Sequence, residues 1–206
     1  MFSKYLLLIR PHHWVKNLLI FFPLLLSHNE YYSYDIINSL YVFISFCLVS
    51  SGVYIFNDIK DAKYDIINSR TKNRPIASGK ISVKIGYLLS TVFVVFSILI
   101  LTLFVPECLF LIFLYIIINI LYSVYLKYIV FVDVIAVSSG FLIRILIGGL
   151  ATGIDQSLWT LLIVCFASIS LATGKRLGQI VENPKYLAAE WNYKLLKNTL
   201  YISVVF

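Results

Sequence analysis

The sequence has 206 residues, of which 60% are hydrophobic and 13% are charged. Soluble domains average about 45–50% apolar and about 25% charged residues, so this composition excludes an ordinary soluble protein and predicts a polytopic membrane protein. The net charge of +7 would suggest nucleic acid as the partner of a soluble protein. Here the basic residues are confined to a few loops, so topology and an anionic substrate explain them better, and we expect no nucleic-acid partner.

Apolar segments follow one another along the whole chain. A spanning helix needs about 20 mainly apolar residues, so they predict an all-α transmembrane bundle of about six to seven spans in a single integral-membrane domain over residues 1–206. The first segment is short and contains Lys16 and Pro23, so we expect it to tilt, kink or enter obliquely. The segments are Trp14–Ser27, Ile36–Phe56, Val83–Val105, Cys108–Leu126, Phe131–Ala151, Leu158–Thr173 and Leu195–Phe206.

The charged residues alternate in sign between successive loops. If the N-terminus lies in the cytoplasm, the outer loops contain no Lys or Arg, and the basic residues of the loops fall on the inner side. This positive-inside distribution predicts a multi-pass protein of the plasma (inner) membrane whose inner loops face the cytoplasm.

Cysteine and histidine give no sign of a disulfide framework or a zinc site. Cys47, Cys108 and Cys165 are isolated within or beside apolar runs. No pair has metal-site spacing, so we expect small buried side chains.

Three aspartates follow the second apolar segment. Asp58, Asp61 and Asp65 fall at i, i+3 and i+7, which places them on one face of a helix. Like charges on one stripe repel unless a cation holds them, and Mg²⁺ prefers oxygen ligands, often carboxylates together with substrate phosphates. Asn57 would supply a neutral oxygen. The alternative is a solvated charged loop between two spans.

Basic residues continue this stretch toward the third segment. Arg70, Lys72, Arg74 and Lys80 suit the remaining oxygens of a phosphate group. Together with the aspartates they predict a metal–diphosphate site at a membrane surface.

Several polar residues lie inside the predicted spans, where they are costly and usually functional. Tyr54 extends the aspartate face inward by one turn. In the fourth segment, Asn119, Ser123 and Lys127 fall at i, i+4 and i+8, with Tyr122 beside them.

Asp133 and Arg144 lie on one face of the fifth segment, about 16 Å apart, so they cannot pair directly but could share one cavity, with Gly140 leaving room between them. The alternative for Arg144 is a structural bond to a backbone carbonyl or to an acid on another helix.

Lys175 and Arg176 end the sixth segment, either as positive-inside charges at a helix end or as substrate ligands.

The aspartate stretch resembles the signature of the UbiA superfamily of intramembrane prenyltransferases. The resemblance rests on Asn57-Asp58-x-x-Asp61-x-x-x-Asp65, followed by Asn68-x-Arg70-Thr71-Lys72-Asn73-Arg74-Pro75-Ile76-Ala77-Ser78-Gly79. It implies an all-helical bundle with a cavity that opens near the cytoplasmic face, where Mg²⁺ bridges the aspartates to a diphosphate.

Further stretches resemble the branch of this family that contains decaprenyl-phosphate phosphoribosyltransferase. They are Arg10-Pro11-His12-His13-Trp14-Val15-Lys16-Asn17, Tyr122-Ser123-x-x-Leu126-Lys127, Asp133-Val134, Ser139-Gly140-Phe141-x-x-Arg144 and Gly174-Lys175-Arg176. The resemblance implies transfer of a phosphoribosyl group from phosphoribosyl diphosphate to a polyprenyl phosphate in a membrane, as a step toward a cell-envelope polysaccharide.

Two features depart from the family pattern. Prenyl-transferring relatives carry a second motif with two aspartates, whereas only Asp133 is present here, between Lys127 and Arg144. This departure favours an additional phosphate group over a prenyl diphosphate alone. The chain also stops inside its last apolar run, so we expect a domain that is incomplete at the C-terminus.

The residues with predicted roles fall into three groups. The predicted catalytic residues are Asp58, Asp61, Asp65 and Asp133, and the predicted metal ligands are Asn57, Asp58, Asp61 and Asp65. The predicted substrate-binding residues are Lys16, Tyr54, Arg70, Lys72, Arg74, Tyr122, Lys127, Arg144, Lys175 and Arg176.

Three functions remain open at this stage. Phosphoribosyl transfer is preferred, prenyl transfer from a polyprenyl diphosphate to an aromatic acceptor comes second, and an inactive fragment or non-catalytic membrane module is the third. The sequence leaves open whether the chain forms a homo-oligomer.

Overall fold

The computed structural model describes the backbone of residues 3–26, 33–129, 131–182 and 193–205, and every regular element within those ranges is a helix. Five helices are long and apolar enough to cross a membrane, which confirms the predicted all-α membrane bundle. The long helices are α3 (Ser33–Asp65), α4 (Val83–Phe104), α5 (Leu109–Val124, extended by the short η2, Pro106–Cys108), α6 (Val132–Thr152) and α7 (Leu158–Glu182).

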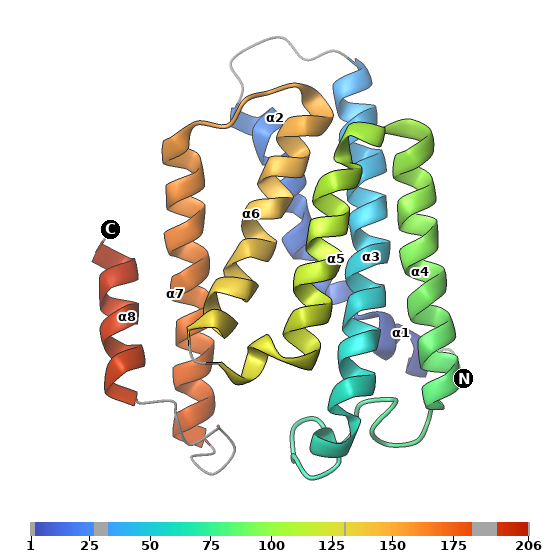
Figure 1. Ribbon diagram of the computed structural model, residues 1–206, viewed down its shortest axis with the longest axis vertical. Helices are drawn as coiled ribbons and strands as arrows, with labels where there is room; N and C mark the ends of the chain where they lie inside the picture. The colour runs from blue at the N-terminus through green and yellow to red at the C-terminus, as the bar shows by residue number, and fades with distance from the viewer. Residues whose placement is uncertain (1–2, 27–32, 130, 183–192, 206) are drawn as a thin grey trace.

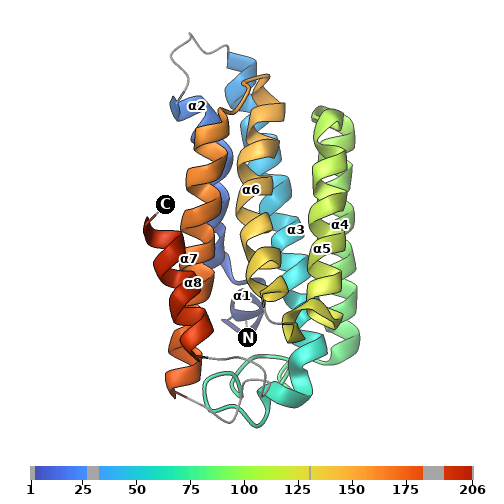
Figure 2. The ribbon, with the colours of Figure 1, turned by 60° about the vertical axis from the view of Figure 1, so that its left-hand side comes forward.

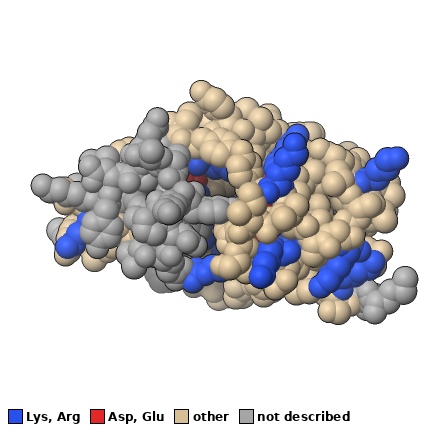
Figure 3. All heavy atoms as spheres, turned by 90° about the horizontal axis from the view of Figure 1, so that it is seen from below, with Lys and Arg blue, Asp and Glu red and all other residues tan. Residues whose placement is uncertain are grey.

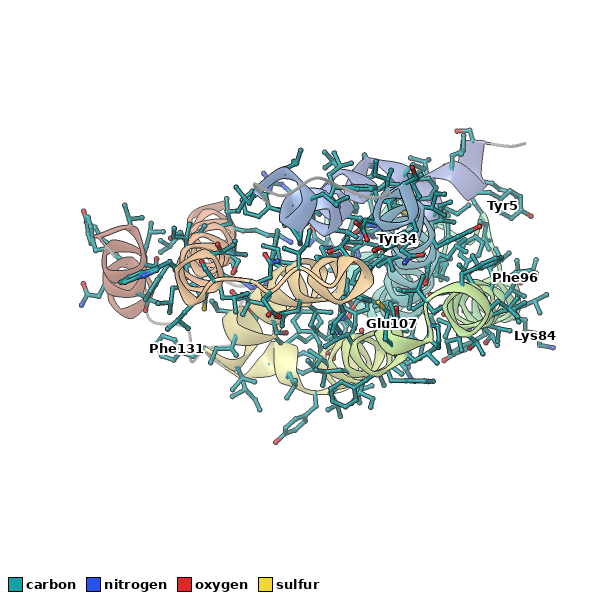
Figure 4. All side chains as sticks on the ribbon, turned by 90° about the horizontal axis from the view of Figure 1, so that it is seen from above. Tyr5, Tyr34, Lys84, Phe96, Glu107 and Phe131 are labelled. Carbon is teal, nitrogen blue, oxygen red and sulfur yellow. The ribbon has the colours of Figure 1, made fainter. Side chains whose placement is uncertain are left out.

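Helix α3 lies at the centre of the bundle. It packs against α4, α5 and α6, and the main core lies between them (Figure 1). Phe46 of α3, Ile112 of α5 and Ile147 of α6 are fully buried there. The outer faces stay apolar, as a bilayer requires: Phe96 of α4 is 54% exposed and points away from the bundle (Figure 4).

The first apolar segment is not one regular helix. The chain begins with α1 (Ser3–Ile9), passes through Arg10 in the left-handed region (φ 56°), and continues as the 3-10 helix η1 (Pro11–Phe21) and the short α2 (Phe22–Leu26). This break agrees with the expected kink, because Pro23 has no N–H to donate to a regular α-helical ladder. Segment η1 packs against α6 and α3, and Figure 2 shows it running along the bundle.

The last predicted segment forms α8 (Tyr193–Val205), which packs against α7 at the edge of the bundle (Figure 1). At 13 residues it is shorter than the spans, and the rest of the predicted segment, Phe206, lies outside the described residues.

The connections segregate to two ends of the molecule. The loop of residues 66–82, the short helix η3 (Leu126–Tyr128) and the end of α7 lie at the lower end in Figure 1, and the connections at residues 105–108 and 153–157 lie at the upper end. Viewed from below, Lys and Arg side chains lie within and beside a hollow (Figure 3). The structure therefore reproduces the alternation of basic and non-basic ends in an integral membrane protein.

Gly148 of α6 allows η1 to lie directly against this helix. A Cβ atom placed at Gly148 would come within 2.1 Å of the Ile20 carbonyl oxygen, which belongs to the η1 backbone and cannot move as a side chain can. The glycine is therefore needed for this close packing.

We expect Gly148→Ala to destabilise the protein by about 1–3 kcal/mol, because the added methyl group would overpack a backbone contact. Thermal unfolding in lipid nanodiscs measures the effect. Gly178→Ala on α7 is the matched control, since a Cβ there meets nothing within 4 Å. Equal melting temperatures for the two variants would contradict this account of the packing.

Candidate functional site

A polar cavity of about 200 Å³ opens between η1, α3, α5, α6 and α7. It lies toward the lower end of the bundle, the end at which Figure 3 shows basic and acidic atoms inside a hollow. Among the described residues, five lining side chains are Lys or Arg and none is Asp or Glu; the basic ones are Arg10, Lys16, Arg74, Arg144 and Lys175. An excess of cations around an enclosed space favours an anionic ligand.

Asp58 and Asp65 stand on the last turns of α3, beside this cavity, and both are buried. Asp58 Oδ1 accepts hydrogen bonds from Arg10 Nη2 at 2.6 Å and from Arg74 Nη1 at 3.2 Å. The same Arg74 nitrogen donates to Asp65 Oδ2 at 2.8 Å. Two arginines from different loops therefore neutralise two carboxylates that would otherwise repel each other across less than two helical turns.

Asp61 is held from another direction. Lys127 of η3 forms an ion pair with its Oδ1 atom, and Asn57 Nδ2 donates to its Oδ2 atom at 2.9 Å. The predicted aspartate face is thus present on a single helix, and each of its three members is met by a basic side chain from elsewhere in the chain.

The oxygen atoms of this face decide whether it suits a metal ion. Among the described residues, no three His, Cys, Asp or Glu side chains converge on one point. On the aspartate face itself, two buried side-chain oxygens have no hydrogen-bond partner: Asn57 Oδ1 and Asp58 Oδ2. Leaving such atoms unsatisfied is costly, and hard oxygen donors are the ligands that Mg²⁺ prefers. The free oxygens of Asn57 and Asp58 therefore suit a magnesium ion, whereas Asp61 and Asp65 are bound by Lys127 and Arg74 in this structure.

Arg144 lines the cavity from α6, and its guanidinium is held by the protein itself. Its Nε donates to Asn17 Oδ1 at 2.9 Å, and Nη1 donates to the Gly140 carbonyl at 2.5 Å. The planar group also lies 4.7 Å from the centre of the Phe46 ring. The backbone-carbonyl alternative raised by the sequence is present, and the space beside Gly140 is taken by the Arg144 side chain itself.

Asp133 is paired with Arg176 in place of sharing the cavity with Arg144. Arg176 Nε and Nη2 each lie 2.5 Å from an Asp133 carboxylate oxygen, in a bidentate pair that joins the start of α6 to α7. Arg176 Nη2 also lies 3.1 Å from the Tyr122 hydroxyl of α5. Neither Asp133 nor Arg176 lines the cavity, so the structure places both as a clamp between helices.

The other predicted residues divide between the cavity and the surface. Tyr54, Tyr122, Lys16 and Lys175 line the cavity. Arg70 and Lys72 are exposed in the loop of residues 66–82 and lie outside the lining. The cavity lining also contains Arg10 and His13, which the predicted site omits, and Asn119 from the polar face of the fourth segment.

His13 shows how basic this region is. Burial first, and then the charges of neighbouring groups led by Lys16, lower the pKa of His13 to about 4. The imidazole is therefore neutral at physiological pH, which the number of nearby cations favours. The only signal for His13 and Arg10 in the sequence was their position in the stretch that begins Arg10-Pro11-His12-His13.

The fold and the cavity together define a polytopic, all-α integral membrane protein with a cation-rich cavity beside a three-aspartate helix end. The model of the UbiA prenyltransferase family matches residues 18–177. The chain belongs to the UbiA prenyltransferase family.

Relatives and solved structures agree with this family. A decaprenyl-phosphate phosphoribosyltransferase of Mycolicibacterium smegmatis is 35% identical over 84% of this chain and 55% of its own length. One of Corynebacterium glutamicum is 33% identical over 84% and 53%. The chain thus spans about half the length of these relatives. The UbiA homologue of Archaeoglobus fulgidus bound to GPP and Mg²⁺ superimposes with a TM-score of 0.84 at 18% identity, covering 98% of this chain and 75% of that one.

We expect Asp133→Asn to lower the stability of the bundle by about 3 kcal/mol, because it removes the carboxylate charge that neutralises the Arg176 guanidinium. Thermal unfolding in nanodiscs measures the change. The double variant Asp133→Asn/Arg176→Met should recover part of the loss, since no uncompensated charge remains. A double variant as unstable as the sum of the two single variants would rule out the direct pair.

Proposed function

We propose that this chain carries the site of a Mg²⁺-dependent membrane transferase that moves a phosphoribosyl group from phosphoribosyl diphosphate to a polyprenyl phosphate and releases diphosphate. The observation that carries the proposal is the lining of the cavity: five Lys or Arg and no Asp or Glu among its described residues, next to the aspartate face of α3. Such a lining suits a donor that bears a phosphate at each end of a sugar better than one with an apolar tail.

The relatives support this choice. The relatives from Mycolicibacterium smegmatis and Corynebacterium glutamicum, about a third identical to the chain, are named decaprenyl-phosphate phosphoribosyltransferase. The product would be a lipid-linked sugar phosphate, a precursor for a cell-envelope polysaccharide. The basic loops at one end favour an active site that faces the cytoplasm across the plasma membrane.

The protein groups would act mainly by positioning and by charge. In the transfer, the bond between ribose C1 and the diphosphate oxygen breaks, and its electron pair leaves with the diphosphate. Arg10 and Arg74, which hold Asp58 in the structure, lie where they can shift to the diphosphate oxygens as negative charge builds there. A bound Mg²⁺ on the aspartate face would neutralise the same leaving group.

The acceptor needs little activation by the protein. A polyprenyl phosphate is already anionic, so one of its oxygens can attack C1 of the oxocarbenium-like sugar without a strong general base. What the site must supply is a fixed approach between the two reactants, since correct placement is worth several orders of magnitude in rate. Tyr54, Asn119 and Tyr122, which line the cavity wall, are placed to orient the sugar.

Prenyl transfer from a polyprenyl diphosphate to an aromatic acceptor is the second candidate. It is favoured by the fold, which is shared with a UbiA homologue bound to GPP and Mg²⁺. The state of Asp133 argues against prenyl transfer. A second metal–diphosphate site would need the Asp133 carboxylate, but this carboxylate is bound by Arg176.

A transfer assay separates the two candidates. Membranes containing the chain receive Mg²⁺ with labelled phosphoribosyl diphosphate and polyprenyl phosphate or, in a second arm, with labelled polyprenyl diphosphate and an aromatic acid. We expect label in the lipid product of the first arm. Product in the second arm alone would overturn the proposal in favour of prenyl transfer, and product in neither would show that this chain does not catalyse transfer.

We expect Asp61→Ala to lower transfer by about a hundredfold or more, because it removes a metal ligand from the leaving-group site. Chelation of Mg²⁺ should have the same effect on the unaltered chain, and added Mg²⁺ should restore it. Lys60→Gln, next to Asp61 but exposed and outside the cavity lining, is the matched control and should stay within about twofold. Full activity of Asp61→Ala would refute the metal assignment.

A further inference from the structure

Five of the predicted substrate-binding residues are basic and lie outside the aspartate helix end and the loop that follows it, and the structure distinguishes among them. Lys127 is paired with Asp61, and Arg176 is paired with Asp133. Arg144 donates to Asn17 and to the Gly140 carbonyl. Each of these three groups already has a partner within the protein. The two that remain are Lys16 and Lys175.

Lys16 and Lys175 both line the cavity, and neither has a carboxylate partner among the described residues. Lys16 comes from η1, and its Nζ atom lies 5.8 Å from the centre of the Phe141 ring on the facing helix α6. Lys175 comes from α7, next to the Arg176 clamp that fixes this turn of the helix against Asp133. The two ammonium groups therefore come from different elements and meet at one cavity.

The basic side chains of the cavity act on one another electrostatically. Lys175 lies close enough to Arg176, Arg10 and Arg74 to be affected by their charges, and Lys16 lies close enough to be affected by Lys175 and Arg144. Such a cluster of like charges is unfavourable when left alone. Arg10 and Arg74 form ion pairs with Asp58. Lys16 and Lys175 form no ion pair with a carboxylate among the described residues: Asp133 lies close enough to attract Lys175, but both of its oxygens are bound by Arg176.

We propose that Lys16 and Lys175 form a second anion subsite, separate from the aspartate face, which binds a phosphate monoester group of a substrate. This subsite rests on the proposed function, and it refines that proposal by assigning the extra phosphate to two named residues. The group belongs either to the end of the donor remote from its diphosphate or to the acceptor lipid. An ammonium on a flexible stem is suited to such a group, because it binds phosphate as a point charge.

The test is direct binding to the chain in nanodiscs at a fixed Mg²⁺ concentration, which requires no turnover. Three probes are used: phosphoribosyl diphosphate, inorganic diphosphate and a polyprenyl phosphate. Inorganic diphosphate lacks the second phosphate and so reports on the aspartate face alone. Lys16→Gln and Lys175→Gln remove one charge each, and Lys60→Gln is the matched control at the same end of the molecule.

If the subsite holds the donor, each cavity variant should weaken phosphoribosyl diphosphate about tenfold and leave inorganic diphosphate within about twofold. If it holds the acceptor, the loss should appear with polyprenyl phosphate instead. Lys16→Arg should retain most of the affinity because it keeps the charge. Unchanged melting temperatures would show that the variants still fold.

The subsite is overturned if neither variant weakens any probe. It is also overturned if inorganic diphosphate loses as much affinity as phosphoribosyl diphosphate, because the lysines would then belong to the diphosphate site. Failure of the unaltered chain to bind any of the three probes would overturn it as well. Prenyl transfer alone in the activity assay would overturn the proposed function but would leave the affinity differences between variants and probes unchanged. Failure of the proposed function and failure of the subsite are therefore distinguishable.

Discussion

The structure of this site depends on how the protein neutralises three carboxylates at the C-terminal end of the central helix α3. Asp58, Asp61 and Asp65 follow one another on the last turns of α3, in surroundings where uncompensated charge is very costly. Cations from three separate segments meet them: Arg10 before η1, Arg74 in the loop after α3, and Lys127 between α5 and α6. These pairs tie segments that lie far apart in the chain to one helix end.

In the proposed transfer, the same pairs prepare the site for an anionic substrate. A side chain that leaves a carboxylate for a diphosphate loses one ionic partner and gains another, so the exchange costs less than bringing a cation out of water. The rest of the cavity lining is built differently. Arg144 is fixed there by an amide and a carbonyl. Behind the lining, Asp133 is bound by Arg176, so the two lysines of the proposed subsite are the lining cations without an ion-pair partner among the described residues.

Close packing of irregular backbone makes this arrangement possible inside a membrane protein. Segment η1 is a 3-10 helix rather than a span, and it carries Lys16 and Asn17 into the bundle. Asn17 is fully buried and donates toward Cys47 and Ser50 of α3 while it accepts from Arg144 of α6. Polar backbone and side chains at this depth are tolerated because they are buried in protein and line a cavity.

The sequence by itself determined the all-α bundle, the aspartate face and the basic end, because hydrophobic length, helical spacing and loop charge are local properties. It also singled out Arg144 and Asp133, since polar groups inside spans stand out against apolar neighbours. Only the tertiary structure decided their partners: Asp133 meets Arg176 of α7, 43 residues away, and Arg144 meets Asn17, 127 residues away. Long-range contacts decide which cations pair with groups of the protein and which stay available to a ligand. No local pattern could therefore have separated Lys16 and Lys175 from the other basic residues.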